Sequence, residues 1–509
     1  MKNHETVSLL LSDGYKQVHA EQYPKGLTKL WSYFTPRRNR IPELDTMVFF
    51  GLQGFIKKYL IDYFNENFFN LPEDEVMEEY TRIVDTMMGK GNYGTEKVRK
   101  LHQLGYLPLE INAVPEGSIV NMGVPCIEVT NTHPDFAWVV QWVESLLSSE
   151  IWKPCAHATV GKIYRDIVDE WYGKTVDDNI PHSSAISDFG FRGMSCLQEA
   201  EKASAAWLCS FGGTATIPAV TYIEHFYNQR NDVDHFAKNA ISTEHSVMCC
   251  NTAIDGNERD MIVRLLTEVY PHASFSMVSD SYDYWNLVDN ILPTVKDEIM
   301  NHDGKLLVRP DSGDIIDISV KTIEHLWDIF GGTVNSKGFK VLDPHIGCVY
   351  GDGVTPRRAA TIYKKLYERG FAANNIVFGA GSFSFTCYQD QNGEFQALTR
   401  DTWSCAIKAT GGIVDGKFIP IFKDPKTDRE SGFSFKKSQR GCCYVWQELD
   451  EFDNPINGKF KWQDGIDPTQ YPNGVHPHKY SAYIPYFKDG KVVTEQTLTE
   501  IRKRLHPNF

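Results

Sequence analysis

Short apolar runs recur at regular distances through the middle of the chain. Each run ends in a loop rich in Gly, Asp or Ser and is followed by a segment with helical spacing of its apolar residues. The runs end at Ser187, Phe211, Ser242, Val278, Arg309, Tyr350 and Phe378, with spacings of 24, 31, 36, 31, 41 and 28 residues. A strand, a loop, a helix and a return need about thirty residues. The pattern therefore predicts seven consecutive β–α units.

Seven such units in one stretch favour an incomplete, TIM-like α/β barrel over residues 161–389. A doubly wound open sheet is the alternative. Residues 1–160 mix helical and strand patterns, and residues 390–509 lose the βα rhythm and carry Gly-Gly turns and Lys-rich stretches. We expect these two end parts to pack together as an α+β domain. Within the first part, helices are expected at 55–65, 74–88 and 136–151, and strands at 107–120 and 125–129.

Composition and charge narrow the class of protein. Of the 509 residues, 42% are hydrophobic and 23% are charged, as in globular proteins. The net charge of −14 argues against a nucleic-acid or anionic-membrane surface, although a local basic pocket for a phosphorylated ligand remains possible. No apolar run approaches the roughly 20 residues that span a bilayer. The eleven cysteines include no Cys-x-x-Cys pair, so a reduced, cytoplasmic protein without a signal peptide is expected.

Chemically active residue types gather in the loops after the predicted strands. The loops read Asp188-Phe-Gly-Phe-Arg-Gly193, Thr243-Glu-His-Ser246, Ser279-Asp-Ser-Tyr-Asp283, Arg309-Pro-Asp-Ser-Gly-Asp314, Gly351-Asp-Gly353 and Gly379-Ala-Gly-Ser382. A single Asp in such a loop is most often a turn or cap residue. In a barrel, however, these loops converge on one rim, so the set predicts a functional site there.

The residue types suit a sugar phosphate that carries a magnesium diphosphate. Carboxylates accept hydrogen bonds from ribose hydroxyls and reach Mg²⁺ directly or through water. Backbone N–H groups at the helix starts after Gly353 and Gly381 can hold a phosphate. The side chains of Arg192 and Arg309 can donate two hydrogen bonds to phosphate or carboxamide oxygens.

Two further side-chain types in these loops have both a structural and a functional interpretation. Phe189 and Phe191 are either ordinary core residues or a stacking face for a flat heterocycle on a Gly-flanked loop. His245 is either a structural histidine or an acid, base or nucleophile whose tautomer the adjacent Glu244 holds.

In this order and spacing, the motifs resemble the nicotinamide phosphoribosyltransferases, a branch of the type II phosphoribosyltransferases, over nearly the whole chain. The resemblance also includes Asp13-Gly-Tyr-Lys16, Tyr33-Phe34, Asn335-Ser-Lys-Gly338, Leu398-Thr-Arg-Asp401, Phe422-Lys-Asp-Pro425 and Glu500-Ile-Arg502. It implies an incomplete α/β barrel plus a domain formed from both chain ends. It also implies a head-to-tail homodimer with shared active sites.

The resemblance implies transfer of the 5-phosphoribosyl group of phosphoribosyl pyrophosphate to nicotinamide, giving nicotinamide mononucleotide and diphosphate in NAD salvage. Mg²⁺ would accompany the diphosphate near Asp280 and Asp311, which would be catalytic together with His245. ATP would be an activating co-substrate that transiently phosphorylates His245.

Further roles follow from the same resemblance. Phe189 would stack on one face of the pyridine ring, and the partner's Tyr15 would cover the other. The implied substrate-binding residues are Tyr15, Phe189, Arg192, Arg309, Gly351, Asp352, Gly379, Gly381 and Arg400. Arg37, Lys408 and Lys423 would bind diphosphate or ATP phosphates.

Some positions depart from the family pattern and keep alternatives open. Ala215 stands where relatives commonly carry an Asp that accepts from the carboxamide, so a nicotinate phosphoribosyltransferase of the same fold is the near alternative. Residues 386–394 form an extra hairpin-like segment before Arg400. More remote alternatives are a barrel glycosidase using Asp280 and Asp311, and a non-catalytic interaction protein that retains the fold.

Overall fold

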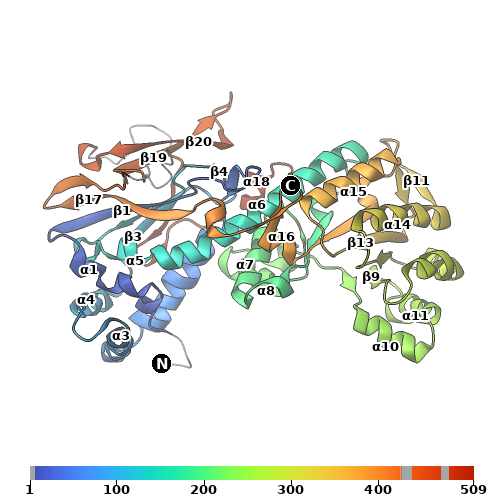
Figure 1. Ribbon diagram of the computed structural model, residues 1–509, viewed down its shortest axis with the longest axis horizontal. Coiled ribbons are helices and arrows are strands. Elements are labelled where there is room, and N and C mark those ends of the chain that lie inside the picture. The colour runs from blue at the N-terminus through green and yellow to red at the C-terminus, as the bar shows by residue number, and fades with distance from the viewer. Residues whose placement is uncertain (1–5, 425, 427–437, 472–480) are drawn as a thin grey trace. The chain divides into compact units, whose positions relative to one another are not determined.

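The computed structural model describes residues 6–424, 426, 438–471 and 481–509 (Figure 1). Pro425, which closes one of the motifs above, lies outside the described residues. The chain divides into two compact units. The terminal unit comprises Met1–Ala156, Tyr222–Gln229 and Thr399–Pro507, and the barrel unit comprises His157–Thr221, Arg230–Leu398 and Asn508–Phe509.

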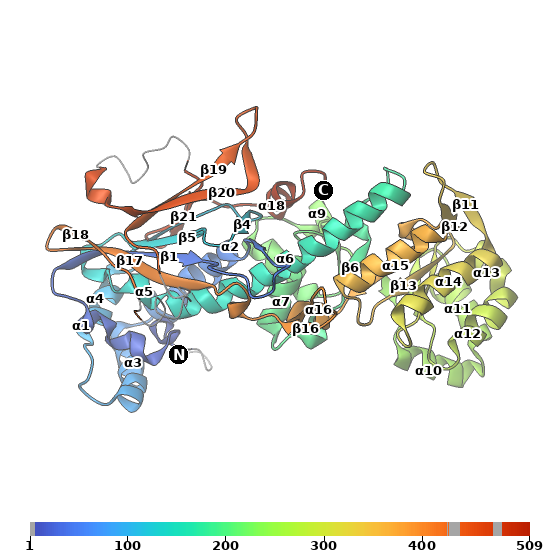
Figure 2. The same ribbon diagram turned by 45° about the horizontal axis from the view of Figure 1, so that its top comes forward.

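The barrel unit is built on a seven-stranded parallel sheet in the order β7-β6-β14-β13-β10-β9-β8. Figure 2 labels β6 and β13 of this sheet. Its strands are β6 (Ile186–Asp188), β7 (Gly213–Thr214), β8 (Ile241–Ser242), β9 (Phe275–Val278), β10 (Leu306–Arg309), β13 (Ile346–Tyr350) and β14 (Ile376–Ala380). Six of the seven predicted run ends fall within or at the end of these strands, and Phe211 precedes β7 by two residues. All residues of β9 and β13 are buried, as expected for parallel strands covered on both faces.

The strand order identifies an incomplete barrel. The strands follow the chain around the sheet from β8 to β14 and then β6 and β7, whereas a doubly wound sheet reverses direction at a switch point. Between the two edge strands, Gly213 pairs in parallel with Lys238, three residues before β8 begins. The prediction of an α/β barrel is therefore confirmed, and the open-sheet alternative is wrong.

Helices follow the barrel strands. They are α6 (Glu144–Thr175, whose first part belongs to the terminal unit), α7 (Leu197–Trp207), α8 (Ile217–Phe226, which also crosses the division), α9 (Asn231–Asp234), α10 (His245–Asp255), α11 (Glu258–Arg264), α12 (Tyr284–Asn286), α13 (Lys296–Met300), α14 (Ile315–Phe330), α15 (Pro356–Glu368) and α16 (Ser382–Thr386). Two hairpins, β11 (Gly332–Val334) with β12 (Lys340–Leu342) and β15 (Cys387–Gln389) with β16 (Phe395–Ala397), complete the unit.

Helix α14 illustrates how the sequence forms these helices. Its N-cap Asp314 accepts a hydrogen bond from the backbone N–H of Asp317 at 2.9 Å. Its buried residues recur three or four positions apart and form one apolar stripe, which includes Ile323 and Leu326. It ends at Gly331, whose φ of 73° is favourable for glycine.

The terminal unit contains an antiparallel sheet in the order β18-β17-β1-β5-β3-β21-β22. Its strands are β1 (Leu27–Thr35), β3 (Leu109–Ala113), β5 (Ile127–Asn131), β17 (Ala406–Val414), β18 (Lys417–Pro420), β21 (Ile484–Lys488) and β22 (Lys491–Val492). Strand β1 pairs with β17 from Leu27↔Val414 to Thr35↔Ala406. Both chain ends therefore contribute to one sheet, as the sequence predicts.

Smaller elements complete the terminal unit. They are β2 (Thr46–Val48), which pairs with β4 (Ile119–Asn121), the hairpin of β19 (Cys442–Leu449) and β20 (Pro455–Ile466), and the helices α1 (His19–Gln22), α2 (Leu52–Phe55), α3 (Glu73–Met88), α4 (Glu96–Leu104), α5 (Val139–Trp142) and α18 (Leu498–Leu505). The helix expected at 136–151 is wrong in its length, because α5 ends at Trp142 and α6 continues past Pro154. A proline inside a helix removes one backbone hydrogen bond, but the buried surroundings of α6 outweigh that loss.

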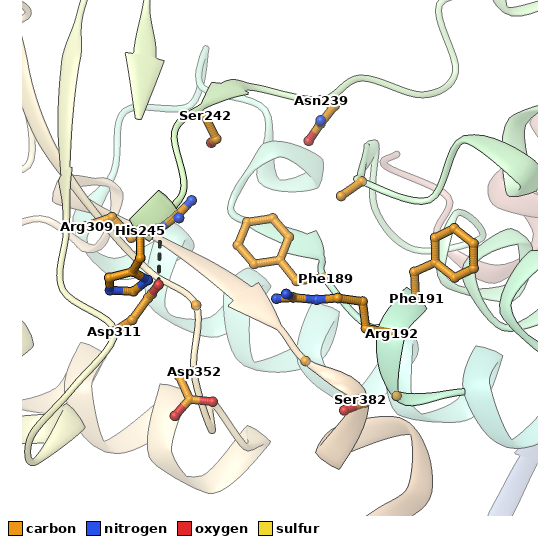
Figure 3. A pocket seen from close by; sticks show the side chains of 14 residues that line it. Phe189, Phe191, Arg192, Asn239, Ser242, His245, Arg309, Asp311, Asp352 and Ser382 are labelled. Carbon is orange, nitrogen blue, oxygen red and sulfur yellow. Dashed lines mark ion pairs between the residues drawn. The ribbon is translucent and has the colours of Figure 1, made fainter. Parts of the chain in front are cut away.

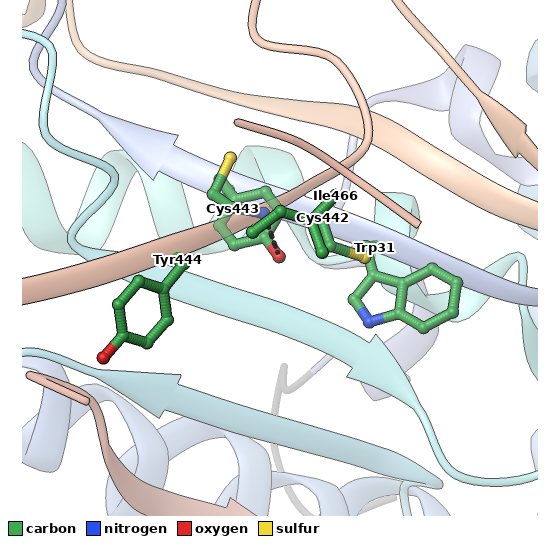
Figure 4. Packing of buried hydrophobic residues seen from close by; sticks show 6 residues of the cluster. Trp31, Cys442, Cys443, Tyr444 and Ile466 are labelled. Carbon is green, nitrogen blue, oxygen red and sulfur yellow. Dashed lines mark hydrogen bonds between the residues drawn. The ribbon is translucent and has the colours of Figure 1, made fainter. Parts of the chain in front are cut away.

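The β19–β20 hairpin is fixed to the central sheet through a buried cluster around β1. Trp31 and Tyr33 pack against Cys442, Cys443, Tyr444 and Ile466 (Figure 4). The Tyr33 hydroxyl donates to Glu128 Oε2 at 2.5 Å and accepts from the Cys443 N–H at 3.1 Å. Burial raises the pKa of Glu128, although hydrogen bonds from Tyr33 and Asn112 oppose the rise. Among the described residues, no helix is long and apolar enough to cross a membrane.

Candidate active site

A cavity of about 660 Å³ opens at the carboxyl ends of the barrel strands (Figure 3). It is lined by Phe189, Phe191, Arg192, Gly193, Ala215, Asn239, Ser242, His245, Arg309, Asp311, Gly351, Asp352, Gly381 and Ser382. All of these residues belong to the barrel unit. This rim is where barrel enzymes place their reactive groups, and the volume suits a small-molecule ligand.

Eight of the residues predicted from sequence lie in the wall of this cavity. They are Phe189, Arg192, His245, Arg309, Asp311, Gly351, Asp352 and Gly381. Gly379 lies against the ring of Phe189, since a Cβ atom at position 379 would be 2.2 Å from Phe189 Cδ2. At Gly351 the same distance would be 3.0 Å. Glycine is therefore required at 379 so that the backbone of β14 can approach the Phe189 ring.

The fully buried Asp188 holds the loop that carries Phe189 and Arg192. It accepts hydrogen bonds from the Gly190 N–H and the Thr214 hydroxyl, both at 2.7 Å, and from the Thr216 hydroxyl at 3.1 Å. Burial raises the pKa of Asp188, and these hydrogen bonds oppose the rise. Asp188 thus joins the loops that follow β6 and β7. Figure 3 shows Phe189 and Arg192 projecting from the first of these loops into the cavity.

His245 is positioned by Asp280. Its Nε2 lies 3.2 Å from Asp280 Oδ1, and Asp280 Oδ2 accepts from the Asp311 N–H at 3.0 Å and the Ser312 hydroxyl at 2.6 Å. Partial burial raises the pKa of Asp280, but these three hydrogen bonds outweigh it and hold the pKa below its usual value. The expected partner, Glu244, is a wrong prediction, because its carboxylate accepts from the Ser246 hydroxyl instead. Glu244 is the N-cap residue of α10 and has an extended backbone conformation.

Arg309 and Asp311 form the charged side of the cavity. The Arg309 side chain donates to the Thr243 carbonyl at 2.9 Å, and its Nε lies 3.5 Å from Asp311 Oδ2 (dashed in Figure 3). That Nε is buried and has no hydrogen-bond partner among the described residues. Burial raises the pKa of Asp311, and the Asp280 and Asp352 carboxylates add to the rise while Arg309 and His245 oppose it. The environments of Asp280 and Asp311 therefore push two neighbouring carboxyl pKa values apart, a feature common at catalytic sites.

Asp311→Asn is expected to raise thermal stability at neutral pH while lowering catalytic activity about 100-fold. Because the folded-state pKa of Asp311 exceeds its unfolded value of about 3.9, stability is lost as pH rises from that value through the folded pKa. Asparagine removes this penalty. Melting curves of the two proteins should coincide below pH 4 and diverge above it; a variant less stable at neutral pH would contradict this account.

Two carboxylates in the cavity wall are of the type that binds a magnesium ion together with a ligand's phosphates. Among the residues described, no three His, Cys, Asp or Glu side chains are arranged to hold a metal ion. Both oxygens of Asp280 already accept hydrogen bonds from protein groups. Asp311 and Asp352 remain as carboxylates in the cavity wall. Mg²⁺ is commonly held by one or two carboxylates together with waters and substrate phosphates, so these two residues fit that role.

Sequence reasoning missed two lining residues, Asn239 and Ser242. Asn239 precedes β8 by two residues, and Ser242 is the last residue of β8. Ser382, in the loop singled out from the sequence, faces Gly193, where a Cβ atom would be 1.8 Å from the Ser382 Cβ. No motif distinguishes Asn239, because its segment approaches the rim through the Gly213–Lys238 pairing. The one feature of the sequence that could have indicated Asn239 was its position just before the predicted strand end at Ser242.

The remaining predicted residues belong to the terminal unit. They are Tyr15, Arg37, Arg400, Lys408 and Lys423. The side chain of Tyr15 is 56% exposed. Burial and the neighbouring Arg400 guanidinium lower the pKa of Arg37, whose Nε donates to the Ser404 carbonyl at 3.0 Å. Arg37 and Arg400 therefore form a small cationic site.

Lys408 belongs to a second charged group in the terminal unit. Its Nζ lies 2.9 Å from Glu144 Oε1, and Lys16 pairs with the other oxygen of the same carboxylate. The backbone N–H of Lys423 donates to the Ser438 hydroxyl at 2.9 Å. The structure thus groups Lys408 with Lys16 rather than with Arg37.

The fold and the site together define a phosphoribosyltransferase of type II architecture. Its features are a parallel incomplete barrel, an α+β unit formed from both chain ends, and a rim of carboxylates, arginines and glycines. Solved structures share this fold. Human nicotinic acid phosphoribosyltransferase matches with a TM-score of 0.60 at 14% identity, over 98% of this chain and 93% of that chain. Nicotinate-nucleotide pyrophosphorylase from Pyrococcus furiosus matches with a TM-score of 0.55 at 12% identity, over 99% and 96%.

Sequence comparisons identify the family. The model of the nicotinate phosphoribosyltransferase (NAPRTase) family matches residues 184–455, and that of the nicotinamide phosphoribosyltransferase N-terminal domain matches residues 7–86. Nicotinamide phosphoribosyltransferase from Acinetobacter baylyi is 36% identical over 97% of this chain and 96% of its own length. The protein of that name from Xanthomonas campestris is 31% identical over 97% of both chains. This chain belongs to the nicotinamide phosphoribosyltransferase family and is a phosphoribosyltransferase.

Proposed function

We propose that the enzyme transfers the 5-phosphoribosyl group of phosphoribosyl pyrophosphate to nicotinamide and so acts in NAD salvage. The observation that carries this proposal is one cavity in which the Phe189 ring, the Arg309 guanidinium and two carboxylates meet the glycine loops. Relatives that share the whole length of the chain bear the name nicotinamide phosphoribosyltransferase. A neutral glycan would need neither the arginines nor the glycine loops, which disfavours the glycosidase alternative.

The pyridine ring would stack on Phe189, whose position is fixed by Gly379 behind it. Arg309 would donate to the carboxamide oxygen, because its buried Nε makes no hydrogen bond to the described residues and such a donor is costly until a ligand satisfies it. Holding the ring nitrogen beside the sugar supplies an orientation term of up to about 10 kcal/mol in favourable cases.

In the reaction, the bond between the anomeric carbon and the diphosphate oxygen breaks, and the pyridine nitrogen forms the new bond to that carbon. Positive charge develops on the anomeric carbon and negative charge on the departing diphosphate. Asp311 and Asp352 would stabilise the first, and Arg192 the second. Mg²⁺, when bound, would neutralise part of the diphosphate charge.

ATP would act through His245. The His245 side chain is 52% exposed, and Asp280 engages its Nε2. With Nε2 protonated toward Asp280, Nδ1 carries the lone pair that attacks the γ-phosphorus of ATP, and ADP leaves. Water later hydrolyses the phosphohistidine to inorganic phosphate. This second hydrolysis would favour condensation.

The active form would be a homodimer with shared sites. Phe191, Leu197, Ile241 and Val247, in or near the rim, are 39%, 52%, 41% and 39% exposed. Such a group of apolar side chains suits coverage by a second copy of the chain. The partner's Tyr15 would then close the face of the pyridine ring opposite Phe189.

The test of the proposed reaction is release of diphosphate. Release should require nicotinamide and phosphoribosyl pyrophosphate together and should match nicotinamide mononucleotide formation one to one. No release with both substrates present, with or without ATP, would overturn the proposal.

Nicotinate is the second candidate substrate, and Ala215 is the observation that favours it. Ala215 is exposed in the cavity wall and offers no acceptor to a carboxamide NH₂. Ala215→Asp should therefore shift the nicotinamide-to-nicotinate ratio of kcat/KM toward the amide by about 100-fold or more, because a carboxylate accepts from the amide and repels the acid. Ala215→Asn, which adds similar volume without charge, is the matched control. An unchanged ratio in the Asp variant would refute the assignment of position 215.

A further inference from the structure

The short helix α16 connects separate loops of the cavity wall. It begins at Ser382, next to Gly381, and both residues line the cavity. Its Phe385 lies under the loop of Phe189, since a Cβ atom at Gly190 would be 2.4 Å from Phe385 Cδ2. A helix this short is marginal on its own, so the position of α16 depends on contacts from other elements.

Helix α6 supplies such contacts from one of its faces. His157 and Tyr164 are seven residues apart, close to two helical turns, so they lie on the same face of α6. His157 Nε2 lies 3.2 Å from the Phe385 carbonyl oxygen, and the Tyr164 hydroxyl oxygen lies 2.6 Å from Ser384 Oγ. Both side chains are fully buried and belong to the barrel unit. Helix α6 therefore fastens α16 at two consecutive residues.

Tyr164 also reaches the loop that carries Asp352. Its hydroxyl donates to the Val354 carbonyl at 2.5 Å, and the Ser384 hydroxyl lies 2.9 Å from the same oxygen. Burial raises the pKa of Tyr164, although a hydrogen bond from Ser384 opposes the rise, so the Tyr164 hydroxyl keeps its proton at neutral pH. These two hydroxyls and the carbonyl form a hydroxyl tie that joins the loop after β13 to α16.

The hydroxyl of Tyr164 has a geometric effect that an apolar side chain could not replace. A phenylalanine at 164 would keep the ring contact with Trp207, whose centroid is 5.5 Å from that of Tyr164. Burying a hydroxyl costs free energy unless it is hydrogen-bonded, so its presence in the core favours one arrangement of its partners. Those partners lie beside Asp352 and Gly381, which both line the cavity.

We propose that Tyr164 is a positioning residue of the active site, which acts through the hydroxyl tie to hold the loops of Asp352 and Gly381 at the separation that the ribosyl substrate needs. The inference rests on the proposed function. The pyridine end of the cavity has a separate support, because the buried Asp188 holds the loop of Phe189. Loss of the tie should therefore affect the sugar substrate more than the pyridine.

The experiment compares Tyr164→Phe with wild type in steady-state kinetics in which nicotinamide and phosphoribosyl pyrophosphate are each varied. The variant should raise the KM for phosphoribosyl pyrophosphate about 10-fold, because the loss of a buried hydrogen bond lets the two loops shift apart. The KM for nicotinamide should stay within about twofold of wild type.

Tyr172→Phe is the matched control. Tyr172 is a buried tyrosine about two turns further along α6, and its hydroxyl makes no hydrogen bond to the part of the chain that the structure describes. This variant also removes one buried hydroxyl from α6, but it leaves the hydroxyl tie intact. It should keep both wild-type KM values.

Hydrogen–deuterium exchange gives a readout that does not depend on the reaction. In Tyr164→Phe the backbone amides of residues 351–355 and 381–386 should exchange faster than in wild type, whereas those of residues 188–193 should not. A wild-type protein that releases no diphosphate would defeat the proposed function, and exchange in these segments would still decide whether Tyr164 holds them.

Unchanged KM values in a folded Tyr164→Phe variant would overturn the inference. An equal rise of both KM values would also overturn it, because the substitution would then loosen the barrel as a whole. If melting curves show that Tyr164→Phe is unfolded, Ser384→Ala provides the decision, since it releases α16 from the tie and leaves Tyr164 bonded to Val354. A selective rise of the KM for phosphoribosyl pyrophosphate in that variant supports the inference, and unchanged constants refute it.

Discussion

Arg309→Ala is expected to lower kcat/KM for phosphoribosyl transfer by about 10²- to 10³-fold, the usual effect of removing one preorganised donor from an active site. The loss has two physical sources. The buried Nε that would meet the carboxamide disappears, and Asp311 loses the guanidinium that opposes its raised pKa. Steady-state kinetics with both substrates varied would measure the effect.

The control for this variant is Arg369→Ala. Arg369 is 43% exposed and pairs with Glu324 at 2.7 Å, away from the lining residues of the cavity. It should retain wild-type kinetics. Activity of Arg309→Ala within a factor of about three of the control would contradict the role of Arg309 in transition-state binding.

Arg309→Ala also tests the proposed sharing of active sites between the two chains of a dimer. Tyr15→Ala and Arg309→Ala would each be nearly inactive alone. Refolded together in equal amounts, they should recover about a quarter of wild-type activity, because half of the dimers would be mixed and each would hold one intact site. No recovery despite proven exchange of subunits would contradict the shared site.

His245→Gln is expected to abolish phosphate incorporation from γ-labelled ATP and with it the whole ATP stimulation, while ATP-independent transfer continues. Asp280→Asn should slow incorporation, because an amide cannot fix the imidazole tautomer as the carboxylate does. Label retention after filtration and acid lability of the product would measure the effect.

The chain offers a matched control in a second exposed histidine–aspartate pair. His272 Nδ1 lies 3.3 Å from Asp303, and the side chains are 80% and 82% exposed. His272→Gln should leave labelling unchanged. Full labelling of His245→Gln would disprove the phosphohistidine assignment.

The fold was predictable where the burial of an element leaves a recognisable pattern of apolar residues in the sequence. Parallel strands buried on both faces leave continuous apolar runs, so run ends such as Val278 and Arg309 could be read directly. The convergence of their loops followed from barrel geometry, which is why Phe189, Asp311 and Asp352 could be grouped before any coordinates were known.

Features that depend on tertiary approach could not be predicted. His245 is positioned by Asp280, thirty-five residues away, whereas sequence reasoning chose the adjacent Glu244. Helix α6 passes through Pro154 because its burial outweighs one lost hydrogen bond.

The central claim is that the cavity at the rim of the barrel unit holds the pyridine ring beside the ribose of the substrate. A crystal structure with nicotinamide mononucleotide tests it most directly. The account predicts the ring against Phe189 with its carboxamide toward Arg309, the ribose over Asp352 and the phosphate at the loop of Gly381. Density for the nucleotide elsewhere, or with its phosphate at the Phe189 end, would contradict the account.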